Sequence, residues 1–241
     1  MANNTRKITV DDCRSDEIII DDFTAIDALD ICLGSGAVLT LKLANFGVGK
    51  NLEIAATLKD NAELLAIMAD FSSGKSAVHV RVDLAGINAR GTWKLSSLAR
   101  GDDDKHFDVS FNHLSPNTSG LMDNYGVARD SSRLVFSGVN EIVKGAKNSK
   151  TRQSAKIIVF DEGAIAKADP QLRIGENKVE ASHAAIVGKL SDEHLFYLMS
   201  RGLSLGEAKR LITYGYLKPI ADYFADEKVK SQIARIVEER V

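Results

Sequence analysis

The feature that most constrains this fold is a change of hydrophobic period near residue 190. Before that point, short apolar runs alternate with clusters of glycine, asparagine and aspartate; after it, apolar residues recur at helical spacing. A period of two alternates side chains between the faces of a strand, whereas spacings of three and four mark one face of a helix. The sequence therefore predicts a mainly β part followed by a small helical part.

The sharpest strand signal covers residues 77–84, where four apolar side chains alternate with more polar ones. Further apolar runs lie at residues 39–43, 52–58, 93–98, 107–111, 134–136, 157–160 and 172–174. Residues 63–69 fit either a strand or a short helix. Many short strands with recurrent turn signals are typical of a sandwich, a barrel or a β-solenoid. No motif repeats at a fixed period, so periodicity does not choose among these three.

The helical part begins with Ser191 as a predicted N-cap, followed by acidic residues in the first turn. Gly202 is expected to end this helix. Ser204 and Glu207 have the spacing of a capping box at the start of the next one. Pro219 marks a break or a new start.

A last helix is predicted to open at Asp226. Its apolar stripe comprises Val229, Ile233, Ile236 and Val237. Three short amphipathic helices bury little surface alone, so they must dock on the β part or on a partner.

Bulk composition excludes several classes of protein. The net charge is −2, so nucleic acid is not an expected partner. Cys13 and Cys32 are the only cysteines, which argues against a disulfide framework and suits a reducing compartment. We see no signal peptide and no apolar run long enough to span a membrane. We therefore expect a cytoplasmic protein without a membrane partner.

Local motifs offer no catalytic constellation. The stretch 47–51 resembles a phosphate loop but lacks its first glycine and its hydroxyl residue. The acidic run 102–104 lacks the spacing of a calcium loop and is expected to be a solvated turn. His106 and His113 are seven positions apart, so on a strand they face opposite ways and do not form a metal pair. We therefore expect no enzymatic activity.

A longer pattern covers residues 169–202. It combines Pro170-Gln171-Leu172, then Ser182-His183 before Ala-Ala-Ile-Val-Gly, then Leu195-Phe196-Tyr197-Leu198, and closes on Ser200-Arg201-Gly202. This pattern resembles the C-terminal signature of the SufB/SufD family of SUF iron–sulfur cluster assembly proteins, and is closest to the SufD branch. The stretch 207–216 also looks like the family, and weaker similarity extends back to about residue 106.

The resemblance implies a right-handed parallel β-helix followed by a helical C-terminal domain. We place an N-terminal segment at residues 1–19, the β-helix core at 20–190 and the helical domain at 191–241. In the family, the helical domain binds a SufC-type ABC ATPase, and two SufB/SufD-type chains pair through their cores. The implied partners are that ATPase and either a second copy or a paralogue. No intrinsic cofactor is expected beyond a transient iron–sulfur cluster.

Two departures from the family pattern concern cluster chemistry. SufD-like chains often carry a cysteine two positions before the signature histidine, where this chain has Ala181. SufB-like chains carry a scaffold cysteine near the position of Gln153. These departures motivate an alternative function, namely a divergent adaptor that keeps the fold and recruits or regulates the ATPase without binding a cluster.

His183, which matches the signature histidine, is the principal candidate site residue. A neutral imidazole can offer a nitrogen lone pair to iron or pass a proton; the alternative is a hydrogen-bonded structural histidine at the junction between strand and helix. Glu180 could add an oxygen ligand, but it also fits a solvated turn. The candidate contacts to the ATPase are Arg201, Lys209, Arg210, Tyr214 and Tyr216, because arginine and aromatic residues are common interface anchors.

Overall fold

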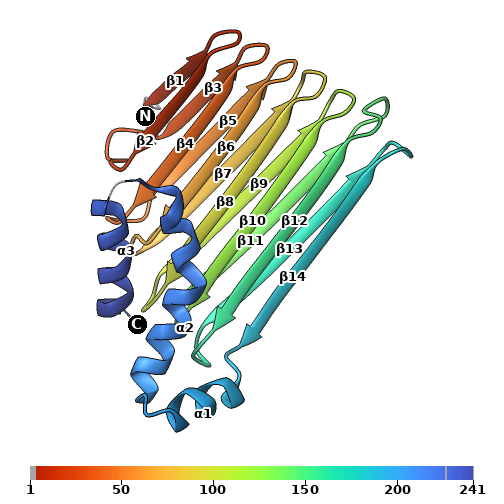
Figure 1. Ribbon diagram of the computed structural model, residues 1–241. Helices are drawn as coiled ribbons and strands as arrows, with labels where there is room; N and C mark the ends of the chain where they lie inside the picture. Colours follow the sequence, from red (N-terminus) through yellow and green to blue (C-terminus); the bar gives the residue numbers. More distant parts are fainter. Residues whose placement is uncertain (1–3, 226, 241) are drawn as a thin grey trace.

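The computed structural model describes residues 4–225 and 227–240. Within these ranges the chain winds as a parallel β-solenoid and ends in three α-helices and a short 3₁₀ helix (Figure 1). Successive strands alternate between two seven-stranded sheets, one built from the odd-numbered strands and the other from the even-numbered strands. The predicted solenoid core with a small helical part is therefore confirmed.

One sheet contains β1 (Thr5–Val10), β3 (Ala28–Leu33), β5 (Asn51–Leu58), β7 (Lys75–Leu84), β9 (Asp104–His113), β11 (Arg133–Ile142) and β13 (Ile165–Ile174). The other contains β2 (Ser15–Ile20), β4 (Val38–Asn45), β6 (Glu63–Asp70), β8 (Arg90–Ala99), β10 (Ser119–Ala128), β12 (Lys150–Val159) and β14 (Glu180–Lys189). The helices are α1 (Asp192–Ser200), α2 (Leu205–Leu217), the 3₁₀ helix η1 (Lys218–Tyr223) and α3 (Glu227–Arg240).

These bounds resolve one open point and add two strands near the N-terminus. The ambiguous stretch 63–69 is a strand, because β6 pairs in register with β4 on one side and β8 on the other. Strand β1 lies within the segment 1–19, and β2 ends one residue beyond it. Strand β1 pairs with β3 and β2 pairs with β4, so both belong to the solenoid.

The length of one turn of the solenoid changes along the chain. Thr5 pairs with Ala28, 23 positions later, whereas Arg133 pairs with Ile165, 32 positions later. The strands lengthen from six residues in β1 to ten in β7 and beyond. Because the repeat drifts in length, the sequence shows no fixed period even though every turn has the same architecture.

Alternation along each strand fills the interior with stacked apolar side chains. Leu29, Ile54, Val80 and Val109 are successive register partners, and each is nearly inaccessible to solvent. In later turns the inward positions hold larger side chains, such as Phe107 and Phe136, whose ring centroids lie 5.8 Å apart. Parallel in-register stacking thus places like residues on like residues, and burial of their apolar surface stabilises the fold.

Left-handed residues stack where each odd strand turns into the next even strand. Asn61, Asn88, Asn117 and Asn148 all have φ between 55° and 60°. Asparagine tolerates this conformation better than most residues. The Asn88 amide donates to Asn61 Oδ1 at 2.9 Å, and the Asn148 amide donates to Asn117 Oδ1 at 3.1 Å. The asparagine turn signals in the sequence therefore mark one edge of the solenoid.

Aspartates organise the opposite edge. The carboxylates of Asp103, Asp130 and Asp161 accept backbone N–H bonds from Gly74, Gly101 and Asp130, at 2.6, 3.0 and 2.9 Å respectively. Asp103 is 3% exposed, so the expectation of a solvated loop at residues 102–104 is wrong for this residue. A buried carboxylate is favourable here because it accepts backbone donors from the neighbouring turn.

A buried ion pair interrupts the apolar interior near this edge. Lys105 Nζ donates to Asp70 Oδ1 at 2.5 Å and to the Ser72 carbonyl at 2.8 Å, and both charged side chains are almost fully inaccessible. Removing one member of such a pair leaves the other buried and uncompensated, which is strongly destabilising.

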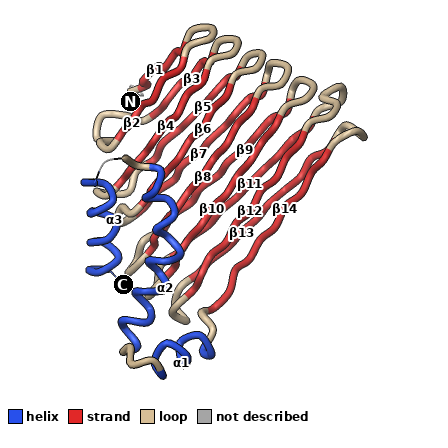
Figure 2. Tube along the Cα trace, viewed as in Figure 1, coloured by secondary structure: helices blue, strands red, loops and turns tan. Residues whose placement is uncertain are grey.

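Helices α2, η1 and α3 cover the outer face of the even sheet near the aspartate edge (Figure 2). A second apolar core forms there between sheet residues, including Ile67, Leu98 and Val127, and helix residues that include Leu217 and Ile233. Of the predicted α3 stripe, Val229, Ile233 and Ile236 are buried; Asp226 and the side chain of Val237 lie outside the described residues. The second and third predicted helices therefore dock on the β part, whereas the first, α1, buries none of its residues.

The helix boundaries follow local signals. Ser204 and Glu207 form the predicted capping box, Gly202 has φ +96° after α1, and Pro219 lies in the first turn of η1. Ser191 occupies the N-cap position of α1, but its side chain makes no capping hydrogen bond. The predicted N-cap position of Ser191 is therefore confirmed, although its hydroxyl does not cap the helix.

We expect Lys105→Met to lower the free energy of unfolding by about 3 to 5 kcal/mol, because Asp70 would be left buried without its cation. Urea unfolding followed by circular dichroism measures this loss. Lys75→Met is the matched control, since Lys75 lies on the adjacent strand but is exposed. Equal stability of the two variants would contradict the role given to the buried pair.

Candidate functional site

The last turn of the solenoid leaves one end of both sheets open. In the described part of the chain no strand pairs beyond β13 or β14. All ten residues of β14 are exposed, and Ile186 and Val187 are 57% and 43% accessible. On β13, Ile165 and Ile174 are also exposed. This open end combines unpaired backbone groups with apolar side chains, which together make a surface suited to strand pairing.

His183 lies on this open end. It pairs in register with Gln153, and Gln153 pairs with Met122, so the three side chains belong to one inward-facing column. Gln153 is buried and its amide donates to the Gln171 carbonyl at 2.8 Å, whereas His183 is exposed. Within the described ranges no hydrogen bond or ion pair is assigned to His183. The imidazole therefore ends the interior column and is accessible from outside.

Glu180 is separated from His183 by the pleat of the strand. The two residues are three positions apart on β14, so their side chains point to opposite faces. Glu180 Oε1 accepts from Lys150 Nζ at 2.8 Å, and both side chains are largely exposed. The structure therefore does not bring the two predicted ligands together.

The positions of the missing cysteines lie on the same side of the sheet as His183. Ala181 precedes the histidine by two positions, so its side chain also faces inward, and Gln153 is the register partner of His183. Among the described residues, no cluster of three or more histidine, cysteine, aspartate or glutamate side chains could hold a metal ion. Cys13 and Cys32 lie near the other end of the solenoid, where Cys32 is on β3 and Cys13 is in the turn after β1.

A second candidate surface is formed by α1 and the start of α2. Helix α1 buries none of its residues and lies clear of the strands at the bottom of Figure 2. Phe196, Tyr197 and Met199 are 75%, 57% and 45% exposed, and the Arg201 guanidinium lies 5.1 Å from the centroid of the Tyr197 ring. Leu205 is also exposed. A cluster of exposed aromatic and apolar residues on one short helix is typical of a protein-binding surface.

The five predicted partner contacts divide into two groups. Arg201 is exposed, and Arg210 and Tyr214 are partly exposed. Lys209 and Tyr216 instead face the solenoid. Lys209 Nζ lies 3.5 Å from Asp161 Oδ1. The Tyr216 ring packs edge-on against Tyr125, with centroids 5.5 Å apart, and burial raises the pKa of Tyr216 to about 12.

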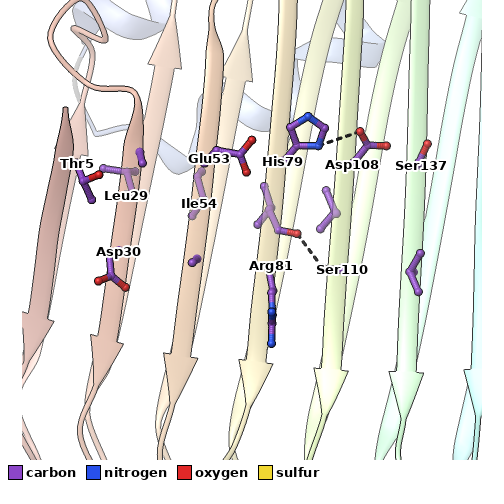
Figure 3. Close-up of a pocket in the computed structure, with 15 residues that line it drawn as sticks. Thr5, Leu29, Asp30, Glu53, Ile54, His79, Arg81, Asp108, Ser110 and Ser137 are labelled. Carbon is purple, nitrogen blue, oxygen red and sulfur yellow. Dashed lines mark hydrogen bonds and ion pairs between the residues drawn. The ribbon is translucent and has the colours of Figure 1, made fainter. Parts of the chain in front are cut away.

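A shallow groove of about 390 Å³ crosses the outer face of the odd sheet (Figure 3). His79 Nδ1 and Asp108 Oδ2 lie 3.1 Å apart in it, and Arg81, Glu53 and Asp30 line it from neighbouring strands. Sequence reasoning did not single out these residues, because they are simply the polar half of alternating strands. The only available signal was the presence of His79 and Arg81 at the outward positions of the sharpest strand.

Comparison with known proteins agrees with this architecture. Residues 9–216 match the family model described as the SufBD core domain of SUF system FeS cluster assembly. The chain therefore belongs to the SufB/SufD family. None of its helices within residues 4–225 and 227–240 has the length and apolar character needed to cross a bilayer.

Individual relatives point the same way. The chain is 34% identical over 159 residues to the iron–sulfur cluster assembly protein SufD of Bacillus subtilis. The aligned stretch covers 66% of this chain and 36% of that protein. It is 26% identical over 161 residues to SufB of the same organism, covering 67% and 35%. It is 34% identical over 140 residues to a SufBD family protein of Mycobacterium bovis, covering 57% and 16%. The chain thus spans about a third or less of the length of these relatives.

The contact between Asp161 and the helical domain yields a pH-dependent prediction. Burial acts to raise the pKa of Asp161, but the hydrogen bond from the Asp130 N–H and the nearby Lys209 and Arg129 charges lower it below its usual 3.8. A carboxyl whose pKa is lower in the folded state contributes stability above pH 3.8 and loses it as the pH falls through the folded value.

We expect Asp161→Asn to lower the free energy of unfolding by about 1 to 2 kcal/mol at pH 7, since it removes charge-assisted interactions. The difference from wild type should shrink below pH 3.8. Urea unfolding at pH 7 and pH 3 measures both values. Glu162→Gln is the control, because the Glu162 carboxylate is next to Asp161 in the chain but its side chain is 93% exposed. A difference independent of pH would refute the assignment.

Proposed function

We propose that this chain is a SufB/SufD-like scaffold component of the SUF machinery, which assembles iron–sulfur clusters in complex with a SufC-type ABC ATPase. The single observation that carries the proposal is the match of residues 9–216 to the SufBD core domain. The open end of the solenoid and the exposed α1 supply two surfaces such a scaffold needs. In this proposal the protein is cytoplasmic and is not itself an enzyme, and any nucleotide is hydrolysed by the ATPase.

The ATPase is proposed to bind the outer surface of α1 and the adjoining start of α2. Phe196, Tyr197 and Arg201 supply the aromatic and arginine side chains that most often anchor interfaces. Arg210 and Tyr214 would extend this surface along α2. Lys209 and Tyr216 would act indirectly, because they hold α2 against the solenoid.

The open end is proposed to pair with the same end of a second chain, which is either another copy or a SufB/SufD paralogue. Pairing two such ends satisfies the free backbone groups of the last turn and buries Ile186, Val187 and their neighbours. If the two ends are related by a two-fold axis, each end is used up by the other, so the assembly would be a dimer.

A transient cluster would then lie between the paired ends as cargo. His183 is exposed at this end and would present its imidazole to iron, while the second chain would supply further ligands. Glu180 points to the opposite face of β14, so it would contribute only if the strand rearranged.

A second candidate function is an adaptor that recruits or regulates the ATPase without binding a cluster. It is motivated by Ala181 and Gln153, which occupy positions where family members often carry cysteines. Anaerobic reconstitution with iron and sulfide separates the two functions. Stable cluster absorption that is lost in His183→Ala would support the scaffold, whereas absence of absorption in the complex with both partners would favour the adaptor.

We expect the double substitution Phe196→Ala and Tyr197→Ala to weaken binding to the SufC-type ATPase at least about tenfold, because it removes two exposed anchors. Titration calorimetry or light scattering after size-exclusion chromatography measures the loss. Point variants are preferable to deletion of residues 191–241, since deletion would uncover the apolar face around Leu98 and Val127. Val48→Ala, at an 80% exposed apolar residue between β4 and β5, is the matched control.

Pairing of the open ends has a separate test. Val187→Lys should convert a dimer into monomers, because it places a charge in the paired surface, and light scattering reports the mass directly. Ile19→Lys, on the exposed face of β2 near the other end, should leave the dimer intact. Dimers that persist in Val187→Lys and dissociate in Ile19→Lys would place the interface elsewhere.

A further inference from the structure

A cavity of about 220 Å³ lies where the helical domain meets the outer face of the even sheet. Strands β8 and β10 line one side of it, and α2 and η1 line the other. None of its lining residues belongs to β13, β14 or α1, so it is separate from the open end and from the exposed α1. A cavity of about 150 Å³ admits benzene, whereas drug-sized ligands need about 300 Å³ or more. The volume therefore suits a molecule of one or two rings.

Three tyrosines give the cavity aromatic walls. Tyr125 lines it from β10, Tyr216 from α2 and Tyr223 from η1. The Tyr125 and Tyr216 rings stand at 72° to each other, with their centroids 5.5 Å apart. Burial raises the pKa of Tyr216 to about 12, so its phenol is neutral at physiological pH. A planar ring that stacks on one of these two faces meets the other edge-on, and both arrangements are favourable for aromatic pairs.

The charges beside these rings disfavour a charged ligand. Lys94 Nζ lies 5.6 Å from the centroid of the Tyr223 ring, and Lys156 Nζ lies 5.6 Å from that of the Tyr125 ring. A ring face attracts a cation, but two of the three rings already face an ammonium group. Lys94 also pairs with Asp123 at 3.2 Å, and this carboxylate would repel an anion. A neutral ligand therefore fits the cavity best.

Two small residues leave room in the cavity. Ser96 is 3% exposed and stands on β8 between the larger outward residues Lys94 and Leu98, opposite Tyr125 in register. Gly215 lines the cavity from within α2, has no positive φ, and would gain a Cβ that meets nothing within 4 Å. Glycine inside a helix is less stable than alanine. Neither the backbone nor a close contact requires glycine at position 215, so its effect is to keep this space free.

We propose that this cavity binds a neutral, planar aromatic molecule of one or two rings that carries a hydrogen-bond acceptor. Its ring would stack against the tyrosines, and its acceptor would receive a hydrogen bond from the Lys94 ammonium, which has three donors. Because both the sheet and the helices line the cavity, the bound molecule would hold the helical domain against the solenoid. This binding site goes beyond the proposed scaffold role and does not depend on it.

Quinoline is the probe for this site, because it is planar, has two fused rings and carries one ring-nitrogen acceptor. In a titration followed by proton–nitrogen correlation NMR, we expect the amide signals of Ser96, Gly215 and Tyr216 to shift. Ser96→Leu should weaken binding at least about tenfold, because the added side chain takes the volume that the ligand needs. Thr92→Leu is the matched control, since Thr92 faces outward on the same strand but does not line the cavity.

Gly215→Leu tests the site from the helix side. Leucine is a better helix former than glycine, so this variant should remain folded. It should also bind quinoline at least about tenfold more weakly than wild type. Unchanged affinity in both filled variants would overturn the proposal, and so would quinoline-induced shifts that are absent or that map to another surface.

Thermal unfolding and a charged probe give independent answers. Excess quinoline should raise the melting temperature of the wild type, because it binds only the folded state, and should leave that of Gly215→Leu unchanged. A wild-type melting temperature that does not respond would refute the site. The cation trimethylanilinium should fail to displace quinoline, whereas displacement would contradict the neutral class of ligand.

Discussion

Parallel in-register stacking is the constraint on which the rest of this structure depends. Each strand bonds to the strand one turn before it and one turn after it, so each turn supplies the template for the next. Inward side chains stack in columns, and turn residues stack as asparagine and aspartate ladders at the two edges. The same constraint leaves the last turn unsatisfied, because β13 and β14 have the ladder on one side only. The open end is a direct consequence of the fold.

The polar groups of the interior differ in how far the stacked turns supply them with partners. Lys105 and Asp70 form an ion pair in the interior, and Ser72 adds hydrogen bonds to both: its hydroxyl donates to Asp70 Oδ1 and its carbonyl accepts from Lys105. Asn140 and His113 Nε2 have no such partner in the described chain.

The helical domain has two faces with different consequences. Its inner face joins the even sheet in a second apolar core, to which Lys209 and Tyr216 add polar and aromatic contacts. Its outer face, on α1, leaves Phe196 and Tyr197 in solvent. Helix α2 connects the two faces, since it contacts β10 of the solenoid directly.

The sequence by itself determined the strands with clear alternation, the capping box at Ser204, the break at Pro219 and the family signature around His183, because these depend on local spacing and on residue type. It could not establish the solenoid from periodicity, since the turn length drifts from 23 to 32 residues. Only the tertiary structure decided that His183 and Glu180 point apart, that Lys209 and Tyr216 face inward, and that Asp103 is buried. Those outcomes depend on which strands become neighbours, and that neighbourhood is set by stacking across the whole chain.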